Sequence, residues 1–247
     1  MISDILVRQG NWLFRWRSYV LAAFIPLVLY SLYGPEPVEA AFGKGVDSAY
    51  EMVCAAVAGL GLLLRCLTVG FVPAGTSGRN TRSQVAESLN TTGMYSLTRN
   101  PLYFANAVTV MGIAMFTQSL VVMLSLTLFL VVYLERIIAA EERFLTEKYG
   151  EVYLAWARRV PAFFPRFSGW HAPEMGFSVK TVLKREYTTL LILVGSLCAI
   201  DQIRDMGSQA NPHWDLHWFV LLGLSLFSYV SLRWMKKHTG LLDVEGR

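Results

Sequence analysis

The sequence predicts an all-α polytopic membrane protein with about six membrane-spanning helices. Of its 247 residues, 54% are hydrophobic and 16% are charged, whereas soluble domains usually carry about 25% charged residues. Four apolar segments approach the roughly 20 residues that a spanning helix needs, and a fifth apolar run is long enough for two short helices. The net charge of +4 is modest and the basic residues lie between apolar segments, so no nucleic-acid partner is expected.

The predicted spans follow from the hydropathy along the chain. The four long apolar segments are residues 12–33, 49–69, 187–203 and 216–234. A further uncharged run, 102–134, carries the polar triplet TQS at its middle. We expect this run to form a hairpin of two helices, each of about 16 residues and about 24 Å. The first segment is longer than the apolar core of a signal peptide, so we expect it to be retained.

The distribution of lysine and arginine predicts the orientation. Basic residues are frequent before the first span, in the second and fourth connecting loops, and in the C-terminal tail, while the other loops carry one lysine or none. Short loops rich in positive charge stay on the cytoplasmic side of a membrane. We therefore expect a multi-pass protein of a bacterial inner membrane or an endoplasmic-reticulum-type membrane, with both termini cytoplasmic.

The chain divides into three predicted segments. Residues 1–72 hold two spanning helices, 73–167 form a core of cytoplasmic loop, hairpin and amphipathic segment, and 168–247 hold a linker and two further spans. Two long loops, 70–100 and 135–184, emerge on the cytoplasmic face, so a soluble cofactor would bind there. The second loop contains RRVPAFFPRF, whose aromatic and basic residues suit the headgroup layer of a membrane.

A cation and a proline stand at the entrance to the hairpin. Pro101 is suited to the first position of a helix, where unpaired N–H groups carry partial positive charge, and Arg99 lies just upstream. Together they would attract a carboxylate or a phosphate at the membrane surface. The alternative is that Arg99 only anchors the helix by extending to water.

An acidic cluster follows the hairpin. If the second helix of the hairpin continues beyond residue 134, Arg136, Glu141 and Glu142 lie at its cytoplasmic end. Because the hairpin returns to the same face, this cluster should lie close to Arg99. The alternative is a solvated helical extension whose internal ion pairs are each worth a few tenths of a kcal/mol.

These residues resemble the integral-membrane methyltransferases. The resemblance rests on TTGMYSLTRNPLY, the apolar hairpin, and the pattern R-x4-EE-x2-L-x3-YG-x2-Y-x6-VP-x3-P, and it covers residues 73–165. The superfamily includes isoprenylcysteine carboxyl methyltransferases, phospholipid N-methyltransferases and lipid A phosphate methyltransferases. The resemblance implies a cytoplasmic site for S-adenosylmethionine and a lipid-like substrate that enters from the bilayer.

The resemblance also implies roles for particular residues. The implied catalytic residues are Arg99, Arg136 and Glu142. The implied cofactor-binding residues are Gly93, Tyr95, Asn100, Pro101, Tyr103, Glu141, Glu142 and Tyr149, with Tyr153 beside the adenine. The predicted substrate-binding residues are Arg79, Arg82 and Arg99, because an anionic acceptor needs positive charge beside it. Asn100 stands where the family has a histidine, and asparagine does not titrate near neutral pH. A histidine base at this position is therefore excluded, while a positional role remains.

The predicted function is methylation of the polar head of a lipid-like substrate. An anionic oxygen, either a lipid phosphate or a prenylcysteine carboxylate, is the favoured acceptor because arginines are plentiful near the hairpin and no base is needed. One alternative is N-methylation of an ethanolamine phospholipid, with Glu142 as the base. Others are an NADPH-dependent reductase of sterol type, a scaffold or a small transporter. No metal is expected, since His213 and His217 are only two potential ligands. The oligomeric state is left open.

Overall fold

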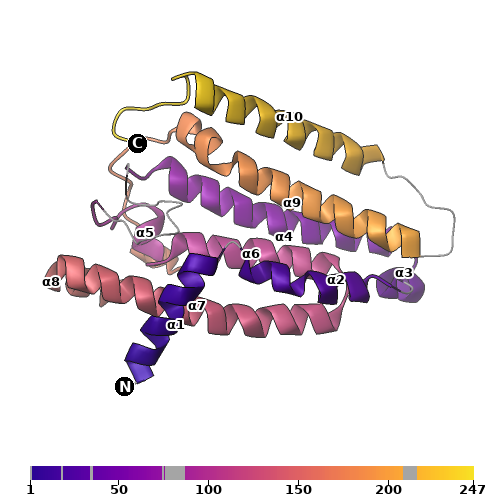
Figure 1. Ribbon diagram of the computed structural model, residues 1–247, viewed down its shortest axis with the longest axis horizontal. Helices are drawn as coiled ribbons and strands as arrows, with labels where there is room; N and C mark the ends of the chain where they lie inside the picture. Colours follow the sequence, from indigo (N-terminus) through magenta and orange to yellow (C-terminus); the bar gives the residue numbers. More distant parts are fainter. Residues whose placement is uncertain (1, 18, 34–35, 74, 76–86, 208–215) are drawn as a thin grey trace.

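The structure is a computed structural model that describes residues 2–17, 19–33, 36–73, 75, 87–207 and 216–247. Every regular element in these residues is a helix (Figure 1). This confirms the predicted all-α class.

Five helices form the body of the molecule. They are α4 (Lys44–Gly70), α6 (Pro101–Phe116), α7 (Leu120–Tyr149), α9 (Val179–Gly207) and α10 (Leu216–His238). They pack in the order α10, α9, α4, α6 and α7, and Figure 1 shows them running along the long axis of the molecule. All except α6 are long and apolar enough to cross a membrane. The predicted spans 49–69, 187–203 and 216–234 fall within α4, α9 and α10.

The predicted hairpin is present as α6 and α7. Gln118 in the turn has a φ of 55°, and the Ser119 hydroxyl oxygen accepts a hydrogen bond from the Val122 N–H at 3.3 Å, which caps α7. α6 has 16 residues, as predicted, but α7 has 30 and therefore extends about 45 Å. The acidic cluster therefore lies on the extension of α7, in the same helix as the second arm of the hairpin.

The predicted first span needs correction. Residues 12–33 do not form one straight helix, because α1 (Ile2–Trp16) ends before η1 (Val20–Phe24) and α2 (Ile25–Ser31) begin. The two parts meet at 85°, and α1 packs across α7. Arg15 and Arg17 explain the break, since a straight span would carry both toward the hydrocarbon region, where charge is costly. Four described helices qualify as spans, or five with this bent pair, and six are reached only if α6 also counts.

Two features hold α4 against its neighbours. Gly61 and Gly112 allow α4 and α6 to approach closely, since a Cβ on Gly112 would lie 2.4 Å from the Ala58 backbone nitrogen. Arg65 of α4 also forms a bidentate pair with Glu186 of α9, at 2.8 and 2.9 Å. Their side chains are 14% and 5% exposed, so this pair fixes α9 to the core.

The remaining short elements lie at the two ends of the bundle. At one end are α5 (Met94–Leu97), α8 (Glu151–Ala157), η2 (Phe167–Gly169) and the C-terminus, while α3 (Pro37–Phe42) lies near the turn of the hairpin at the other end (Figure 1). The two long loops predicted to be cytoplasmic therefore meet at one end. Which side of a membrane this end faces remains a prediction.

Candidate active site

The start of α6 is held by a segment from much later in the chain. The backbone N–H of Arg99 donates to the Pro161 carbonyl at 2.9 Å. The backbone N–H of Arg166 in turn donates to the Leu97 carbonyl at 2.9 Å. Residues 160–166, part of the stretch predicted to lie in the headgroup layer, therefore form a wall beside the entrance to the hairpin.

Asn100 contributes to the same junction. It is 8% exposed, and its side-chain amide Nδ2 donates to the Ala162 carbonyl at 2.9 Å. Its backbone N–H donates to Thr98 Oγ1 at 3.3 Å, and Pro101 follows as the buried first residue of α6. These contacts give Asn100 a structural role at the junction, and the implied cofactor contacts of Asn100 and Pro101 stay predictions.

Arg99 and Glu142 form an ion pair between the start of α6 and the extension of α7. Arg99 Nη2 lies 3.1 Å from Glu142 Oε1, and Arg99 Nη1 donates to the Ala157 carbonyl of α8 at 3.2 Å. The two side chains are 18% and 26% exposed, so the pair is largely withdrawn from water. The return of the hairpin thus brings the predicted cation and acid together.

A second contact joins the same two helices. The Tyr103 hydroxyl donates to Glu141 Oε2 at 2.7 Å. Arg99 just before α6 and Tyr103 in its first turn therefore both contact the adjacent acids of α7. Four of the residues implied by the resemblance therefore form one cluster.

Other predicted residues lie elsewhere. Arg136 Nε donates to Gln9 Oε1 of α1 at 2.8 Å, and Nη1 contacts Val132 and Glu135 of its own helix. Tyr149 is the last residue of α7, beyond the paired acids. Arg79 and Arg82, predicted to bind the substrate, lie outside the described residues.

Gly93 is required by the backbone where it precedes α5. Its φ of 59° and ψ of −132° lie in a region that favours glycine. Its N–H donates to the His171 carbonyl at 2.9 Å, and the Ser96 hydroxyl donates to the Gly93 carbonyl at 2.7 Å. The local backbone thus explains the glycine at this position, and the contact of Gly93 with the cofactor stays a prediction.

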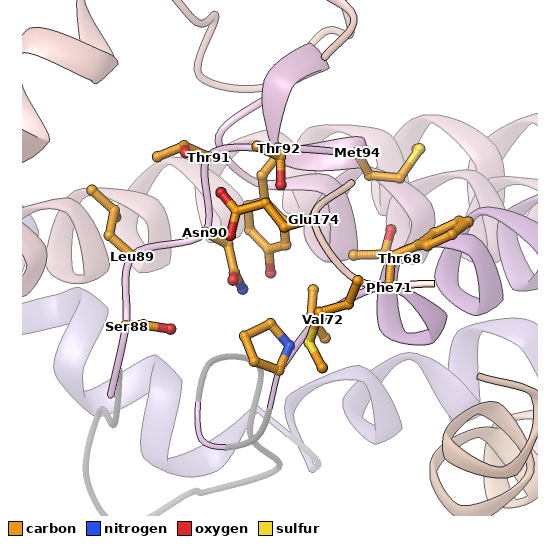
Figure 2. A pocket seen from close by; sticks show the side chains of 13 residues that line it. Thr68, Phe71, Val72, Ser88, Leu89, Asn90, Thr91, Thr92, Met94 and Glu174 are labelled. Atoms are coloured by element: carbon orange, nitrogen blue, oxygen red, sulfur yellow. The ribbon is translucent and has the colours of Figure 1, made fainter. Parts of the chain in front are cut away.

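A pocket of about 200 Å³ opens beside this turn (Figure 2). It lies between the end of α4, residues 88–95 and residues 174–175. Of the predicted site residues Tyr95 lines it, whereas Arg99 and Glu142 do not. The pocket and the Arg99–Glu142 pair are therefore neighbouring features at one end of the bundle.

The pocket includes polar side chains that the resemblance does not imply. Asn90 Nδ2 is buried there without a hydrogen-bond partner among the described residues. Burial, with the negative charge of Glu141 as a smaller cause, raises the pKa of the Tyr95 hydroxyl. Asn90 belongs to the polar run NTT before Gly93, which could have indicated it. Glu174 comes from the distant linker, and no local pattern marks it.

Four buried polar atoms of the Arg99–Glu142 pair and of the adjacent helix α8 have no hydrogen-bond partner in the described part of the chain. They are Arg99 Nε, Glu142 Oε1, Tyr153 Oη and Trp156 Nε1. The Glu142 oxygen lies within ion-pair distance of Arg99, but the geometry is not that of a hydrogen bond. Buried polar groups in native proteins are nearly always paired, so these atoms require an explanation, and a bound ligand or ordered water is one.

A separate acidic group lies at the other end of α6. Carboxylate oxygens of Glu36, Asp47 and Glu51 come within 4.8 Å of one another. Arg204 Nη1 lies 2.8 Å from Glu51 Oε1 and offsets part of this charge. Burial raises the pKa of Glu36 to about 7, while Arg204 acts in the opposite direction. The spacing could accommodate a cation, but the nearby guanidinium already provides a positive charge.

Comparison with known proteins supports the resemblance for the middle of the chain. Residues 53–152 match the model of the family described as phospholipid methyltransferase. The cobalt-zinc-cadmium resistance protein CzcN of Cupriavidus metallidurans is 42% identical over 81 residues, which are 33% of this chain and 37% of that protein. The nickel-cobalt-cadmium resistance protein NccN of Alcaligenes xylosoxydans xylosoxydans is 35% identical over 108 residues, 44% of each chain.

The aligned regions thus span less than half the length of either relative, and no solved structure matches the chain. The family match includes α6, most of α4, all of α7 and the first two residues of α8. It therefore contains Arg99, Tyr103 and both paired acids. Over residues 53–152, the chain therefore matches the phospholipid methyltransferases, a family of integral-membrane methyltransferases.

Proposed function

We propose that this membrane methyltransferase uses S-adenosylmethionine to methylate an anionic oxygen in the polar head of a lipid-like substrate. The observation that carries the proposal is the Arg99–Glu142 pair, which is withdrawn from water and still has unpaired polar atoms. It lies within the segment that matches the methyltransferase family. These atoms are hydrogen-bonding groups that a charged ligand could use.

The side chains present fit the cofactor. Its methionine part carries a carboxylate and an ammonium group, which need hydrogen-bond donors and acceptors respectively. Arg99 Nε is a donor without a hydrogen-bond partner among the described residues, and Glu142 Oε1, although in the ion pair with Arg99, accepts no hydrogen bond from them. Tyr103 and Glu141 lie directly beside them. When bound, the cofactor would supply an activated methyl group on a sulfonium.

An anionic acceptor suits these residues because it requires no base. A phosphate or carboxylate is already ionised at neutral pH, and its burial needs a positive partner. Arg99 can provide that charge while it holds the acceptor oxygen in line for displacement. Such positioning can be worth about 7–11 kcal/mol. Asn100, which cannot act as a histidine base, is compatible with this chemistry.

N-methylation of a phospholipid is the second candidate. The description of the matching family favours it, and Glu142 is the carboxylate at hand to accept a proton from an amine. The two candidates differ in the charge of the product. A methyl ester removes a negative charge from the lipid, whereas methylating an ethanolamine head leaves its charge unchanged.

This difference gives a reason to favour the anionic acceptor. Both curated relatives have names that refer to resistance to divalent metals. Divalent cations concentrate at negatively charged lipid surfaces, so removing negative charge from head groups would weaken their accumulation there. We propose that lipid O-methylation by this protein lowers the binding of such cations to the membrane surface.

The first test is transfer of radiolabelled methyl from S-adenosylmethionine into a total lipid extract by the purified protein in detergent. Label that migrates as lipid and is released by mild alkali would support a methyl ester. Alkali-stable label in a more highly methylated amine would support N-methylation instead. If no lipid is labelled and calorimetry detects no cofactor binding, the methyltransferase proposal is refuted, and NADPH binding should then be measured.

A further inference from the structure

Tyr153 is the most deeply buried of the side chains with an unpaired polar atom near the Arg99–Glu142 pair. It lies on α8 and is 2% exposed, and its ring contacts Trp156 with 5.7 Å between centroids. Its hydroxyl has no hydrogen-bond partner among the described residues. A tyrosine held this far from water without a partner is unusual, because the hydroxyl loses its hydrogen bonds to water and gains none in return.

The backbone explains how Tyr153 reaches this position. Gly150, with a φ of 54°, ends α7 and starts α8, so the chain changes direction between the two helices. The Ala157 carbonyl at the end of α8 then accepts a hydrogen bond from Arg99 Nη1 at 3.2 Å. α8 is thereby held against the start of α6, with Tyr153 enclosed.

The electrostatic surroundings of Tyr153 show which groups it faces. Burial raises the pKa of its hydroxyl, the nearby Glu142 carboxylate raises it further, and the Arg99 guanidinium acts in the opposite direction. The hydroxyl therefore stays protonated at neutral pH and can donate a hydrogen bond. Glu142 is already in an ion pair with Arg99 Nη2, whereas Arg99 Nε has no hydrogen-bond partner among the described residues. Arg99 Nε belongs to the side chain that contacts α8 through Nη1.

We propose that Tyr153 Oη and Arg99 Nε together bind one anionic oxygen group of a ligand, as a two-donor anion site beside the ion pair. This inference rests on the proposed function for the identity of the ligand. The anion is a carboxylate or a phosphate, and it has two possible sources. One is the carboxylate of the cofactor, and the other is the head group of the lipid acceptor. In both cases Tyr153 contacts the ligand and is a binding residue of the site.

The test compares Tyr153→Phe with the wild-type protein in detergent, and it uses Tyr187→Phe as the matched control. Tyr187 is also a buried tyrosine, but it lies on α9 and packs against Tyr229 of α10. Both substitutions remove one hydroxyl and keep the ring. Calorimetry measures the affinity for S-adenosylhomocysteine and for dioctanoylphosphatidic acid, with dioctanoylphosphatidylcholine as the lipid blank. Methyl transfer and Tm are measured on the same preparations.

We expect Tyr153→Phe to bind one of the two anionic probes about 10- to 150-fold more weakly, the loss typical of a hydrogen bond to a charged group. Its Tm should be unchanged or higher, because the hydroxyl has no partner in the folded chain. Weaker binding of S-adenosylhomocysteine alone identifies the cofactor carboxylate as the anion, and weaker binding of phosphatidic acid alone identifies the acceptor. Tyr187→Phe should bind both probes as the wild type does.

Three results would overturn the anion site. Unchanged affinity for both probes would mean that the Tyr153 hydroxyl meets only water. A fall in Tm together with an equal loss of both affinities would mean that it supports the fold. Failure of the wild type to bind either probe would also overturn it. Methyl transfer tests the proposed function separately from the anion site. If the wild type methylates lipid and Tyr153→Phe has the same activity and affinities, the proposed function stands and the anion site is refuted.

Discussion

Replacement of Arg99 by alanine is the most direct test of the candidate site. At 3.1 Å and an effective dielectric constant of about 20, the gross attraction between Arg99 and Glu142 is about 5 kcal/mol. Desolvation and the partial exposure of both side chains reduce the net stabilisation to about 1–3 kcal/mol. The substitution also removes the hydrogen bond to the Ala157 carbonyl. We therefore expect Arg99→Ala to lower Tm measurably without preventing folding.

The effect on turnover should be much larger than the effect on stability. Removing one oriented donor that stabilises charge at a reaction centre typically costs about 10²- to 10³-fold in rate. We expect Arg99→Ala to lower lipid methylation at least a hundredfold. Arg143→Ala is the control, because Arg143 lies next to Glu142 on the extension of α7 and forms an ion pair with Glu147. The side chains of that pair are 55% and 64% exposed. It should keep near-normal turnover.

The decisive comparison is activity at a temperature well below both melting transitions. If Arg99→Ala has a melting curve of a folded protein and methylates lipid within tenfold of wild type, Arg99 is an interfacial anchor with no role at the reaction centre. If Arg143→Ala loses as much activity as Arg99→Ala, the loss reflects the general charge of this surface. Only a loss specific to Arg99 supports a role at the reaction centre.

The remaining predictions concern packing and charge elsewhere. Glu186→Gln should lower Tm strongly, by the equivalent of about 3–5 kcal/mol, because it leaves the buried Arg65 without its anionic partner; a shift under 2 °C in thermal melts would contradict this. Gly112→Ala should lower Tm because its Cβ would collide with α4, whereas Gly59→Ala, whose Cβ meets nothing within 4 Å, should leave Tm unchanged or raise it. The raised pKa of Glu36, about 7 against 4.5, means that the folded protein keeps a proton that the unfolded chain releases. The stability that protonated Glu36 contributes is therefore complete below about pH 4.5 and is lost as the pH rises through 7. Glu36→Gln should make the fall in Tm between about pH 5 and 8 less steep.

Hydropathy and local pattern were sufficient for much of the fold. The spans within α4, α9 and α10 and the turn of the hairpin at residues 117–119 follow from apolar length and one polar triplet, which are local properties. The bend between Trp16 and Val20 was missed because a length criterion counts apolar residues and does not weigh Arg15 and Arg17 within them.

The sequence also indicated which residues carry charge at the membrane surface. Arg99 and the paired acids could be identified because a hairpin returns its two ends to one face, so proximity followed from topology alone. The sequence could not show that Arg136 turns to α1, since that depends on where α1 packs. It gave no sign of Glu174 at the pocket, because the linker reaches that position through contacts with residues 93–97 and with Gly70 and Phe71, which are distant in the sequence.

What the sequence determined by itself is therefore the helical membrane architecture and the identity of the charged residues at one end of it. Only the tertiary structure decided which of these residues meet, and that Tyr153 is enclosed beside them with an unpaired hydroxyl. The physical reason is that hydropathy and helical period act over a few neighbouring residues. Hydrogen bonding and burial at this site depend instead on α6, α7 and α8 together with residues 160–166, whose relative positions are fixed by packing.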